Sequence, residues 1–293
     1  FNQFISLLIN NNEKLFPALI HERFKESLFS PGNSTQNELI MKLKKWDDDR
    51  FKELSKSPYN IVLVDDLSTR EIMKKIHPKA LIYTFVKPCL THNTPDIQEE
   101  YDLVFAGTTL QKTKNHSLFT ELLSGFDDIL NRKLKVAILG NLGDNIDYKN
   151  ALNHNYKMID IDDLGQLSRE QALTVFAKSR VLLLTSGRDA NPRVISEAAT
   201  CGARVIALDI LSDGFEVLSS NPAIGSLIKV DPFTKSYIEN GNISCMITPD
   251  LVKDILNEIE KSKTSIFTKE VAKRLFDLPK NLEESLAAII ALS

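Results

Sequence analysis

From residue 101 onward, short runs of valine, isoleucine and leucine alternate with segments that have helical spacing. The apolar runs lack the polar alternation of strands with one solvent-exposed face, so each run should be covered on both faces. Strands covered in this way form a parallel sheet flanked by helices. Residues 101 to about 260 are therefore predicted to form a doubly wound α/β domain, with strands at 102–107, 135–141, 156–162, 180–186 and 203–209 and helices at 117–130, 168–179 and 192–200.

The amino-terminal part of the chain has fewer strand-like runs, which are expected at 61–66 and 80–85. A polar segment that contains proline, at 91–100, is typical of a boundary between domains. A chain of 293 residues is long enough for two ordinary domains. We therefore expect a smaller α/β domain, reduced or incomplete, at 1–100, followed by the doubly wound domain at 101–264 and by helices within 265–293.

The composition excludes several classes of protein. A formal net charge of −3 gives no overall field that would draw the chain onto nucleic acid or an acidic membrane. Three widely spaced cysteines, Cys89, Cys201 and Cys245, argue against a disulfide framework and a CxxC metal site, and they suit a reducing cytosol. The sequence has no run of about 18 apolar residues, and its first residues lack the basic start of a signal peptide. Because it begins at Phe1, the chain is also compatible with a fragment of a longer protein.

The loop at 187–190 leads into a sharply specified helix start. Ligands of an open parallel sheet bind outside the carboxyl ends of its strands, where this loop is expected. Asn191 is a preferred N-cap residue, Pro192 a preferred first helical residue, and Gly202 a preferred stop. The first N–H groups of such a helix are unpaired and carry a partial positive charge. They therefore predict a site for an anion such as a pyrophosphate.

Acidic and basic side chains surround this helix start. Glu197 lies a little over one turn into the helix, and its carboxylate, which only accepts hydrogen bonds, suits two neighbouring ribose hydroxyls. Asp189 lies on the loop, where it could accept hydrogen bonds from a sugar or could order the loop as an Asx residue. Arg188 and Arg193 flank the same site with positive charge. Together these residue types are typical of a site for a nucleotide diphosphate.

The segment also resembles the donor-sugar site of the family-4 retaining glycosyltransferases, which have the GT-B fold. The signature of that family is an acid, seven residues, a glutamate and a run of small residues that ends in glycine. Here Asp189, seven residues and Glu197 are followed by the small-residue run from Ala198 to Gly202. The resemblance implies that a nucleotide diphosphate sugar binds at this position.

Further landmarks of the family follow in order along about 101–255. Gly107 ends an expected strand, and Lys112 and Lys114 come after it, as do the basic groups that hold the diphosphate in the family. The segment at 163–168 resembles the loop that borders the nucleobase, and Gly140 closes a strand in the expected place. The resemblance makes Asp189 and Lys114 the catalytic candidates, and the donor-binding candidates are Gly107, Lys112, Leu164, Arg188, Asn191, Arg193 and Glu197.

The sequence departs from the family pattern in three places. Asp189 stands where the family normally has glutamate, and its side chain is one methylene shorter. Thr108 stands where arginine is usual, so one positive charge at the phosphates is missing unless Lys112 or Arg193 supplies it. The glycine-rich loop of the family's first domain has no counterpart in 1–40. These departures concern the sugar contact, one phosphate contact and the amino-terminal half of the chain.

By this resemblance the protein is a metal-independent hexosyltransferase. It would move a sugar from a UDP- or GDP-linked donor to a hydroxyl acceptor, with retention, in polysaccharide or glycoconjugate synthesis. The acceptor would be a glycan or glycolipid bound on the side of the 1–100 domain, and helices within 265–293 would cross back onto that domain. No cofactor, metal or nucleic acid is expected. A cytoplasmic location is expected, and peripheral association with the inner face of a membrane is compatible with it.

Two other interpretations stay open on sequence grounds. A GT-B-like nucleotide-sugar 2-epimerase would need acids and histidines from both domains, whereas His77 and His92 are more typical of surface or core histidines. A non-catalytic module that binds nucleotide sugars within a larger synthase is favoured slightly by the departures from the family pattern. The Asp65–Asp66 pair at a strand end resembles a metal-binding pair, but isolated pairs of this kind are common and we expect no metal there.

Overall fold

The computed structural model describes most of the chain beyond residue 97 and short parts of the chain before it. The chain divides into two compact units, Phe1–Lys87 with Leu278–Ser293, and Pro88–Asp277, and each unit is described by itself. The described residues are 61–64, 74–75, 78, 81–84, 98–108, 114–141, 143, 146–186, 192–209, 215–230, 247–262 and 268–277.

In the first unit the structure describes a pair of parallel strands. Strand β1 (Ile61–Val64) pairs with strand β2 (Leu81–Thr84), with Ile61 opposite Leu81 and Val64 opposite Thr84. Both strands lie within the apolar runs from which they were predicted. The parallel pairing also fits the α/β class expected for this part of the chain.

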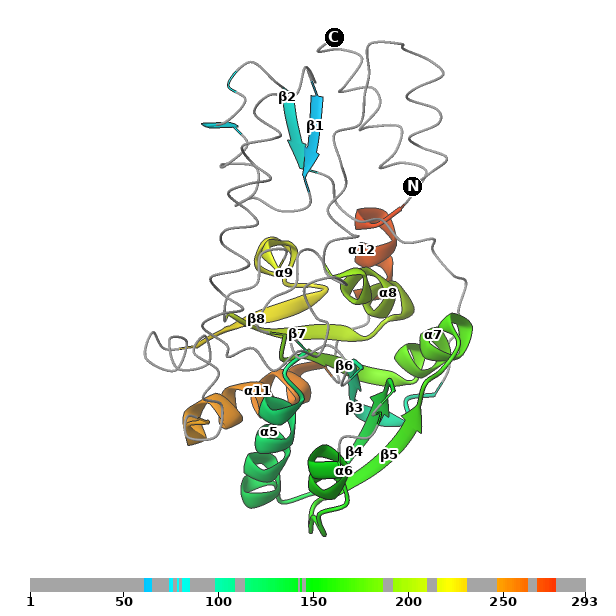
Figure 1. The fold of residues 1–293 in the computed structure, drawn as a ribbon, viewed down its shortest axis with the longest axis vertical. Helices are drawn as coiled ribbons and strands as arrows, with labels where there is room; N and C mark the ends of the chain where they lie inside the picture. Colours follow the sequence, from blue (N-terminus) through cyan, green and yellow to red (C-terminus); the bar gives the residue numbers. More distant parts are fainter. Residues whose placement is uncertain are drawn as a thin grey trace. The chain divides into compact units, whose positions relative to one another are not determined.

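The second unit is built on a six-stranded sheet in the order β5-β4-β3-β6-β7-β8 (Figure 1). Every neighbouring pair in it is parallel. The doubly wound parallel sheet predicted from the sequence is therefore confirmed, with one strand more than the sequence predicted. The strands are β3 (Tyr101–Ala106), β4 (Leu134–Leu139), β5 (Ile159–Gly165), β6 (Ser179–Leu184), β7 (Arg204–Asp209) and β8 (Gly225–Lys229).

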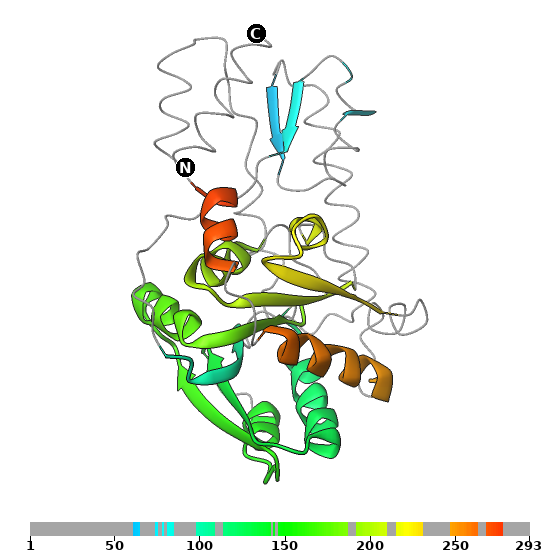
Figure 2. The same ribbon diagram turned by 180° about the vertical axis from the view of Figure 1, so that it is seen from behind.

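Helices cover both faces of this sheet, as Figures 1 and 2 show from opposite sides. The residues of each face form their own buried apolar cluster. One cluster joins the sheet to α5 (His116–Ile129), α6 (Ile146–Leu152) and α11 (Pro249–Lys261). The other joins it to α7 (Arg169–Ala177), α8 (Arg193–Cys201), α9 (Glu216–Ser220) and α12 (Thr268–Leu275).

Strand β3 shows why the apolar runs carry no polar alternation. Its residues Leu103 and Phe105 belong to the cluster beneath α5, whereas Val104 between them belongs to the opposite cluster, and all three are almost completely buried. Phe105 stacks on Phe119 of α5, with the two ring centroids 4.2 Å apart. A polar side chain at any of these positions would lose its hydration without gaining a partner.

The predicted helix ends agree with the structure in part. Helix α7 ends at Ala177 and not at the predicted residue 179, because Ser179 is the first residue of β6. Ser168 and Gln171 form the predicted capping box at the start of α7, and Gly202 ends α8 with a φ of 107°. The predicted start of α8 is wrong by one position. Pro192 is the N-cap, not the first helical residue, because its ψ of 122° is extended and helical geometry begins at Arg193.

Membrane spans and metal-binding groups were considered among the described residues. Within them, no helix combines the length and the apolar character that a membrane span requires. Over the same residues, no group of three or more histidine, cysteine or acidic side chains could hold a metal ion. Cys201 is buried in the apolar cluster of α8, where it packs as a small hydrophobic side chain.

Candidate functional site

The strand order places the candidate site between β3 and β6. These strands are neighbours, but the chain runs from β3 outward through β4 to β5 and from β6 outward through β7 to β8. In open parallel sheets the crevice at such a reversal of strand order, outside the carboxyl ends of the strands, is where ligands bind. We call this side of the sheet the carboxyl edge. Gly107 follows β3 there, and Thr185 follows β6.

Thr185 joins the end of β6 to the turn before α5. Its hydroxyl donates a hydrogen bond to the carbonyl oxygen of Lys114 at 2.8 Å and lies 3.3 Å from that of Asn115. Asn115 is the N-cap of α5 in the left-handed conformation, with a φ of 59°. The buried threonine therefore holds the turn that carries Lys114 at the carboxyl edge, although the two residues are far apart in the sequence.

Three glycines end neighbouring strands at this edge and are joined through the backbone. The N–H of Gly107 donates to the carbonyl of Leu139, and the N–H of Gly140 donates to the carbonyl of Gly165. Gly140 has a φ of +133° and Gly165 a φ of +63°, values that favour glycine. A bare backbone of this kind lets a ligand approach the strand ends closely, which is a common reason for glycine at such sites.

The side chains of Lys114 and Thr108 take different positions beside these glycines. A Cβ atom on Gly107 would lie 3.2 Å from Cβ and Cγ of Lys114, so the stem of the lysine packs directly against Gly107. Thr108 donates from its hydroxyl to the carbonyl oxygen of Asn141 at 3.1 Å and thus connects the chain after β3 to the chain after β4. At the position where the family has arginine, this chain therefore has a side chain that supports the edge.

His116, the first residue of α5, is buried behind the glycines. Its Nε2 lies 3.4 Å from the carbonyl oxygen of Gly107, and in the tautomer protonated at Nε2 it donates to that oxygen. Its ring makes edge contacts with Phe105 and Tyr148. Burial, with a smaller contribution from the charge of Lys114, lowers the pKa of His116, so its neutral form is favoured.

The sequence predicted that Leu164 lies in a loop. In the structure it lies near the end of β5. The register of β5 against β4 shifts here, because Ile138 faces Asp163 and Leu139 faces Gly165. Leu164 is the extra residue of this irregularity, and its partly buried side chain packs against the cluster of α7 and α8. Such bulges redirect the chain near binding sites, and this one precedes the short connection from β5 to α7.

Helix α8 starts at the carboxyl edge after β6 and carries Arg193 and Glu197. Arg193 is exposed in its first turn, whereas Glu197 retains 22% side-chain exposure. The Nε of Arg169, the first residue of α7, donates to Oε1 of Glu197 at 3.0 Å. A carboxylate that only accepts hydrogen bonds therefore lies about one turn into α8, where one of its oxygens already has a cationic donor from the start of α7.

The described residues contain part of the predicted site. Gly107, Lys114, Leu164, Arg193 and Glu197 all belong to segments at the carboxyl edge, and the structure brings Gly107 and Lys114 into direct proximity. Predicted residues and patterns outside the described residues are Lys112, Arg188, Asp189, Asn191, His77, His92, Cys89, Cys245 and the Asp65–Asp66 pair.

Three residues at this edge were not predicted as site residues: Arg169, His116 and Thr185. Arg169 directly follows the recognisable N-cap Ser168, which marks it as the first residue of a helix. Thr185 ends an apolar run, so its place at the carboxyl edge was readable. Their partners, however, lie 28 and 71 residues away in the sequence and depend on the packing of the sheet.

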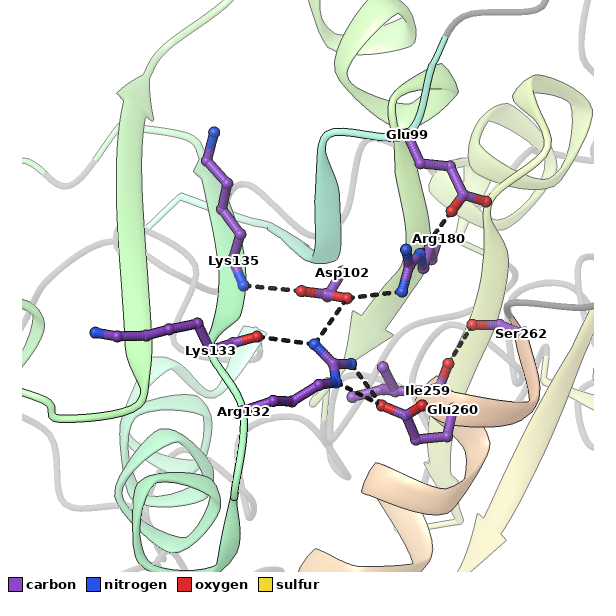
Figure 3. A network of polar contacts seen from close by, with 9 residues as sticks. All are labelled: Glu99, Asp102, Arg132, Lys133, Lys135, Arg180, Ile259, Glu260 and Ser262. Atoms are coloured by element: carbon purple, nitrogen blue, oxygen red, sulfur yellow. Dashed lines mark hydrogen bonds and ion pairs between the residues drawn. The ribbon is translucent and has the colours of Figure 1, made fainter.

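A network of charged side chains lies at the opposite edge of the sheet (Figure 3). Asp102, at the start of β3, accepts hydrogen bonds from the guanidinium of Arg180 at 2.9 Å and from the backbone N–H of Lys135 at 3.0 Å. It also pairs with Arg132 at 3.2 Å, and Arg132 donates to Glu260 of α11. We call this group the Asp102 network. Because it joins the amino ends of the strands, its role is in the fold and not in the candidate site.

Comparisons with known proteins agree with this geometry. Residues 91–232 match the family model described as "Glycosyl transferases group 1". A search of curated proteins finds no match to the chain. The matched region begins just before β3 and ends just after β8, so it contains the whole parallel sheet and the carboxyl edge.

Solved glycosyltransferase structures share the fold at low sequence identity. The chain aligns with the GtfA/B complex (TM-score 0.55, 13% identity, 83% of this chain and 47% of that chain). It aligns with sucrose-phosphate synthase from Thermosynechococcus elongatus (TM-score 0.54, 15% identity, 84% and 63%). A glycosyltransferase from Rickettsia africae ESF-5 gives a TM-score of 0.54 at 16% identity, over 82% and 66% of the two chains.

At these identities the similarity concerns the fold alone. The chain spans less than two thirds of the length of each of these structures, and less than half of the first. The parallel sheet, its strand order and the match over 91–232 agree with one another. The chain therefore has a GT-B-like α/β fold, and the part of it that contains the sheet is similar to the family "Glycosyl transferases group 1".

Proposed function

We propose that this chain is a retaining glycosyltransferase of the family-4 type, which binds a UDP- or GDP-linked sugar at the carboxyl edge and transfers the sugar to a hydroxyl acceptor. The observation that carries the proposal is the position of Glu197 in α8, the helix that follows β6 at the reversal of strand order. Its carboxylate would accept hydrogen bonds from the two ribose hydroxyls of the donor.

The diphosphate of the donor would lie between the start of α8 and the turn that carries Lys114. The first turn of a helix offers backbone N–H groups and a partial positive charge to an anion, and Arg193 in that turn adds a full charge. The glycines that end β3 and β4 would let the phosphates approach the backbone. Lys114 would then stabilise the charge that develops on the diphosphate as it leaves.

In the proposed reaction the bond between the anomeric carbon and the diphosphate oxygen breaks, and the acceptor oxygen bonds to the same carbon from the same face. The acceptor proton passes to the departing diphosphate, so no nucleophilic side chain is required. Asp189, which lies outside the described residues, would contact the sugar. The proposal includes no metal ion or cofactor, because helix start and lysine would balance the phosphate charge. Turnover in the presence of EDTA tests this part.

The acceptor and the surroundings of the reaction are also part of the proposal. A glycan or glycolipid acceptor would place the enzyme in polysaccharide or glycoconjugate synthesis. Catalysis would take place in the cytoplasm, with peripheral membrane association where the acceptor is a lipid. The match to a glycosyltransferase family and the fold support the proposed acceptor and location because they indicate the class of enzyme.

The direct test is turnover. The full chain is incubated with UDP- and GDP-sugars and a range of glycan acceptors, and the released nucleotide is measured. Hydrogen bonds to a carboxylate contribute about 1.5–3 kcal/mol, so Glu197→Ala should weaken nucleotide binding about tenfold to a hundredfold and reduce turnover accordingly. Glu170→Ala, which removes an exposed glutamate from the first turn of α7, is the matched control.

Two outcomes would contradict the proposal in different ways. Nucleotide bound away from 187–197 in a complex with UDP or GDP would refute the site. Tight nucleotide binding without turnover on any acceptor would favour the second candidate, a non-catalytic module that binds nucleotide sugars. Thr108 gives that candidate its specific support, because the residue at the usual arginine position is engaged with the carbonyl of Asn141 and carries no charge.

A further inference from the structure

The ion pair between Arg169 and Glu197 leads beyond the proposed function. Glu197 has one oxygen, Oε1, within 3.0 Å of the Nε of Arg169. A carboxylate has two oxygens with about four lone-pair sites in total, so one donor leaves most of its capacity for other hydrogen bonds. The arginine therefore restricts the orientation of the carboxylate without preventing it from accepting bonds from a ligand.

Both residues are held by well-formed local structure. Arg169 directly follows Ser168, whose side chain accepts from the backbone N–H of Gln171 while Gln171 accepts from the N–H of Ser168. Glu197 lies within α8 between the buried residues Ser196 and Ala198. The backbone positions of the two charged groups are thus defined, and the ion pair orders only the flexible ends of the side chains.

The pair contributes to the site more than to the fold. Half of the Arg169 side chain is exposed, and ion pairs with exposed partners add little to stability because water screens them. The packing of α7 and α8 comes instead from apolar residues of the same buried cluster, such as Phe176 and Ile195. Arg169 also lies close to the expected position of the nucleobase, because it follows the end of β5 by four residues.

We propose that Arg169 is a positioning residue for nucleotide recognition, which holds Glu197 so that its second oxygen meets the ribose hydroxyls of the donor. The inference rests on the proposed function, since it assigns a role to a residue that supports the same nucleotide site. It predicts that Arg169 acts only through Glu197 and only on ligands that have ribose hydroxyls. Because the Glu197 side chain is already ordered before the ligand binds, binding does not have to pay the entropy of ordering it, and the affinity is higher.

The test measures the dissociation constants of UDP and GDP and of their 2′,3′-dideoxy analogues by calorimetry on the full chain. Ordering one long side chain on binding lowers affinity about threefold to tenfold, so Arg169→Ala should weaken binding of the nucleotide with the ribose hydroxyls by this factor. The same variant should bind the dideoxy analogue as the wild type does. Arg169→Lys, which keeps the charge, should recover part of the loss.

A double-mutant cycle separates positioning from a direct contact. If Arg169 acts through Glu197, the variant with both Arg169→Ala and Glu197→Ala binds UDP or GDP no more weakly than Glu197→Ala alone. Lys133→Ala is the matched control, because it also removes one cation from an exposed ion pair, with Asp160, but on the opposite edge of the sheet. This control should leave every dissociation constant unchanged.

The outcomes distinguish failure of this inference from failure of the proposed function. Wild-type protein that binds neither UDP nor GDP would overturn both. Where the wild type binds, unchanged affinity in Arg169→Ala, an equal loss for the dideoxy analogue, or additive losses in the double variant would overturn the role of Arg169 alone. A melting temperature of Arg169→Ala close to that of the wild type confirms that the measurements concern a folded protein.

Discussion

A Cβ atom on Gly140 would lie 1.9 Å from the backbone oxygen of Gly107. The ends of β3 and β4 therefore approach so closely that only a residue without a side chain fits between them. The backbone of Gly140 also has a φ of +133°, which residues with side chains rarely adopt. This contact determines how the chain leaves both strands at the candidate site.

Replacing Gly140 by alanine should therefore be severe. The new methyl group meets backbone atoms, which cannot move aside as a flexible side chain can, and the positive φ adds strain. We expect a loss of about 3 kcal/mol or more in the free energy of unfolding, measured by urea denaturation.

The matched control for this substitution is Gly165→Ala at the end of β5. Gly165 also has a positive φ, but no atom lies within 4 Å of the position that its Cβ would occupy. The left-handed conformation alone costs alanine about 1–2 kcal/mol. Equal losses in the two variants would contradict the importance of the contact with Gly107.

Removing the hydroxyl of Thr185 should affect both stability and binding. Thr185→Val leaves the carbonyl of Lys114 without its donor from β6, at a cost of about 1–2 kcal/mol in the free energy of unfolding. Because the turn that carries Lys114 is then held less firmly, the affinity for UDP or GDP should fall as well. Thr174→Val is the control, since it removes an exposed hydroxyl that bonds to Glu170 within α7. If the variant loses stability but binds nucleotide like the wild type, Thr185 does not contribute to binding.

His116 should make stability depend on pH. Burial lowers its pKa in the folded protein from the ordinary value of 6.5, so the unfolded chain binds a proton at pH values where the folded chain does not. The free energy of unfolding is then unaffected by this histidine above about pH 6.5, and it falls as the pH decreases below that value toward the folded pKa. Thermal unfolding between pH 5 and 8 should show a smaller slope for His116→Asn. His154→Asn, at an exposed position, controls for the loss of a histidine. An unchanged slope in His116→Asn would contradict the prediction.

The Asp102 network should stabilise the fold without contributing to binding. Asp102→Asn leaves the guanidinium groups of Arg132 and Arg180 near a neutral side chain of the same shape, and we expect a loss of about 2 kcal/mol in the free energy of unfolding. Lys133→Ala breaks an exposed pair at the same edge and should cost at most about 1 kcal/mol. Neither substitution should change nucleotide affinity in protein that remains folded. A change in nucleotide affinity would contradict the prediction, because it would show that the Asp102 network affects binding at the opposite edge.

Much of the second unit could be predicted from the sequence, because its strands are buried on both faces. Val181, Leu182 and Leu183 are all fully buried, and only a two-sided environment tolerates three such residues in succession. The start of α7 was equally readable from Ser168 and Gln171, because a capping box is a local arrangement. Local signals of this kind do not require knowledge of the neighbouring elements.

Other elements gave weaker signals or were overlooked. Strand β8 has only five residues at the sheet edge and includes an exposed lysine, Lys229, so its pattern does not stand out. Helix α11, in contrast, has a capping threonine, Thr248, followed by Pro249 at its first turn and four buried apolar residues on one face. Its sequence carries the ordinary signals of a helix.

The side-chain contacts around the predicted site could not be read from the sequence. The type and spacing of Glu197 indicated a nucleotide-binding carboxylate, yet its pairing with Arg169 depends on how α7 and α8 pack against each other. The same holds for Pro192, since proline is typical of the first helical position and only the observed ψ makes it the N-cap. Pairwise geometry between distant segments is not encoded in a single local pattern.

The hydrogen bond between Thr185 and Lys114 has a consequence for biosynthesis. A ribosome makes the chain from its amino end, so Lys114 emerges 71 residues before Thr185, whose hydroxyl holds the turn that carries it. Strand β6 must also insert beside β3 before that hydroxyl reaches its acceptor. If the chain binds a nucleotide as proposed, a nascent chain that stops short of residue 185 would have most of the glycine-lined edge but not the hydroxyl that holds the turn with Lys114, so ligand could assist folding only after β6 has inserted.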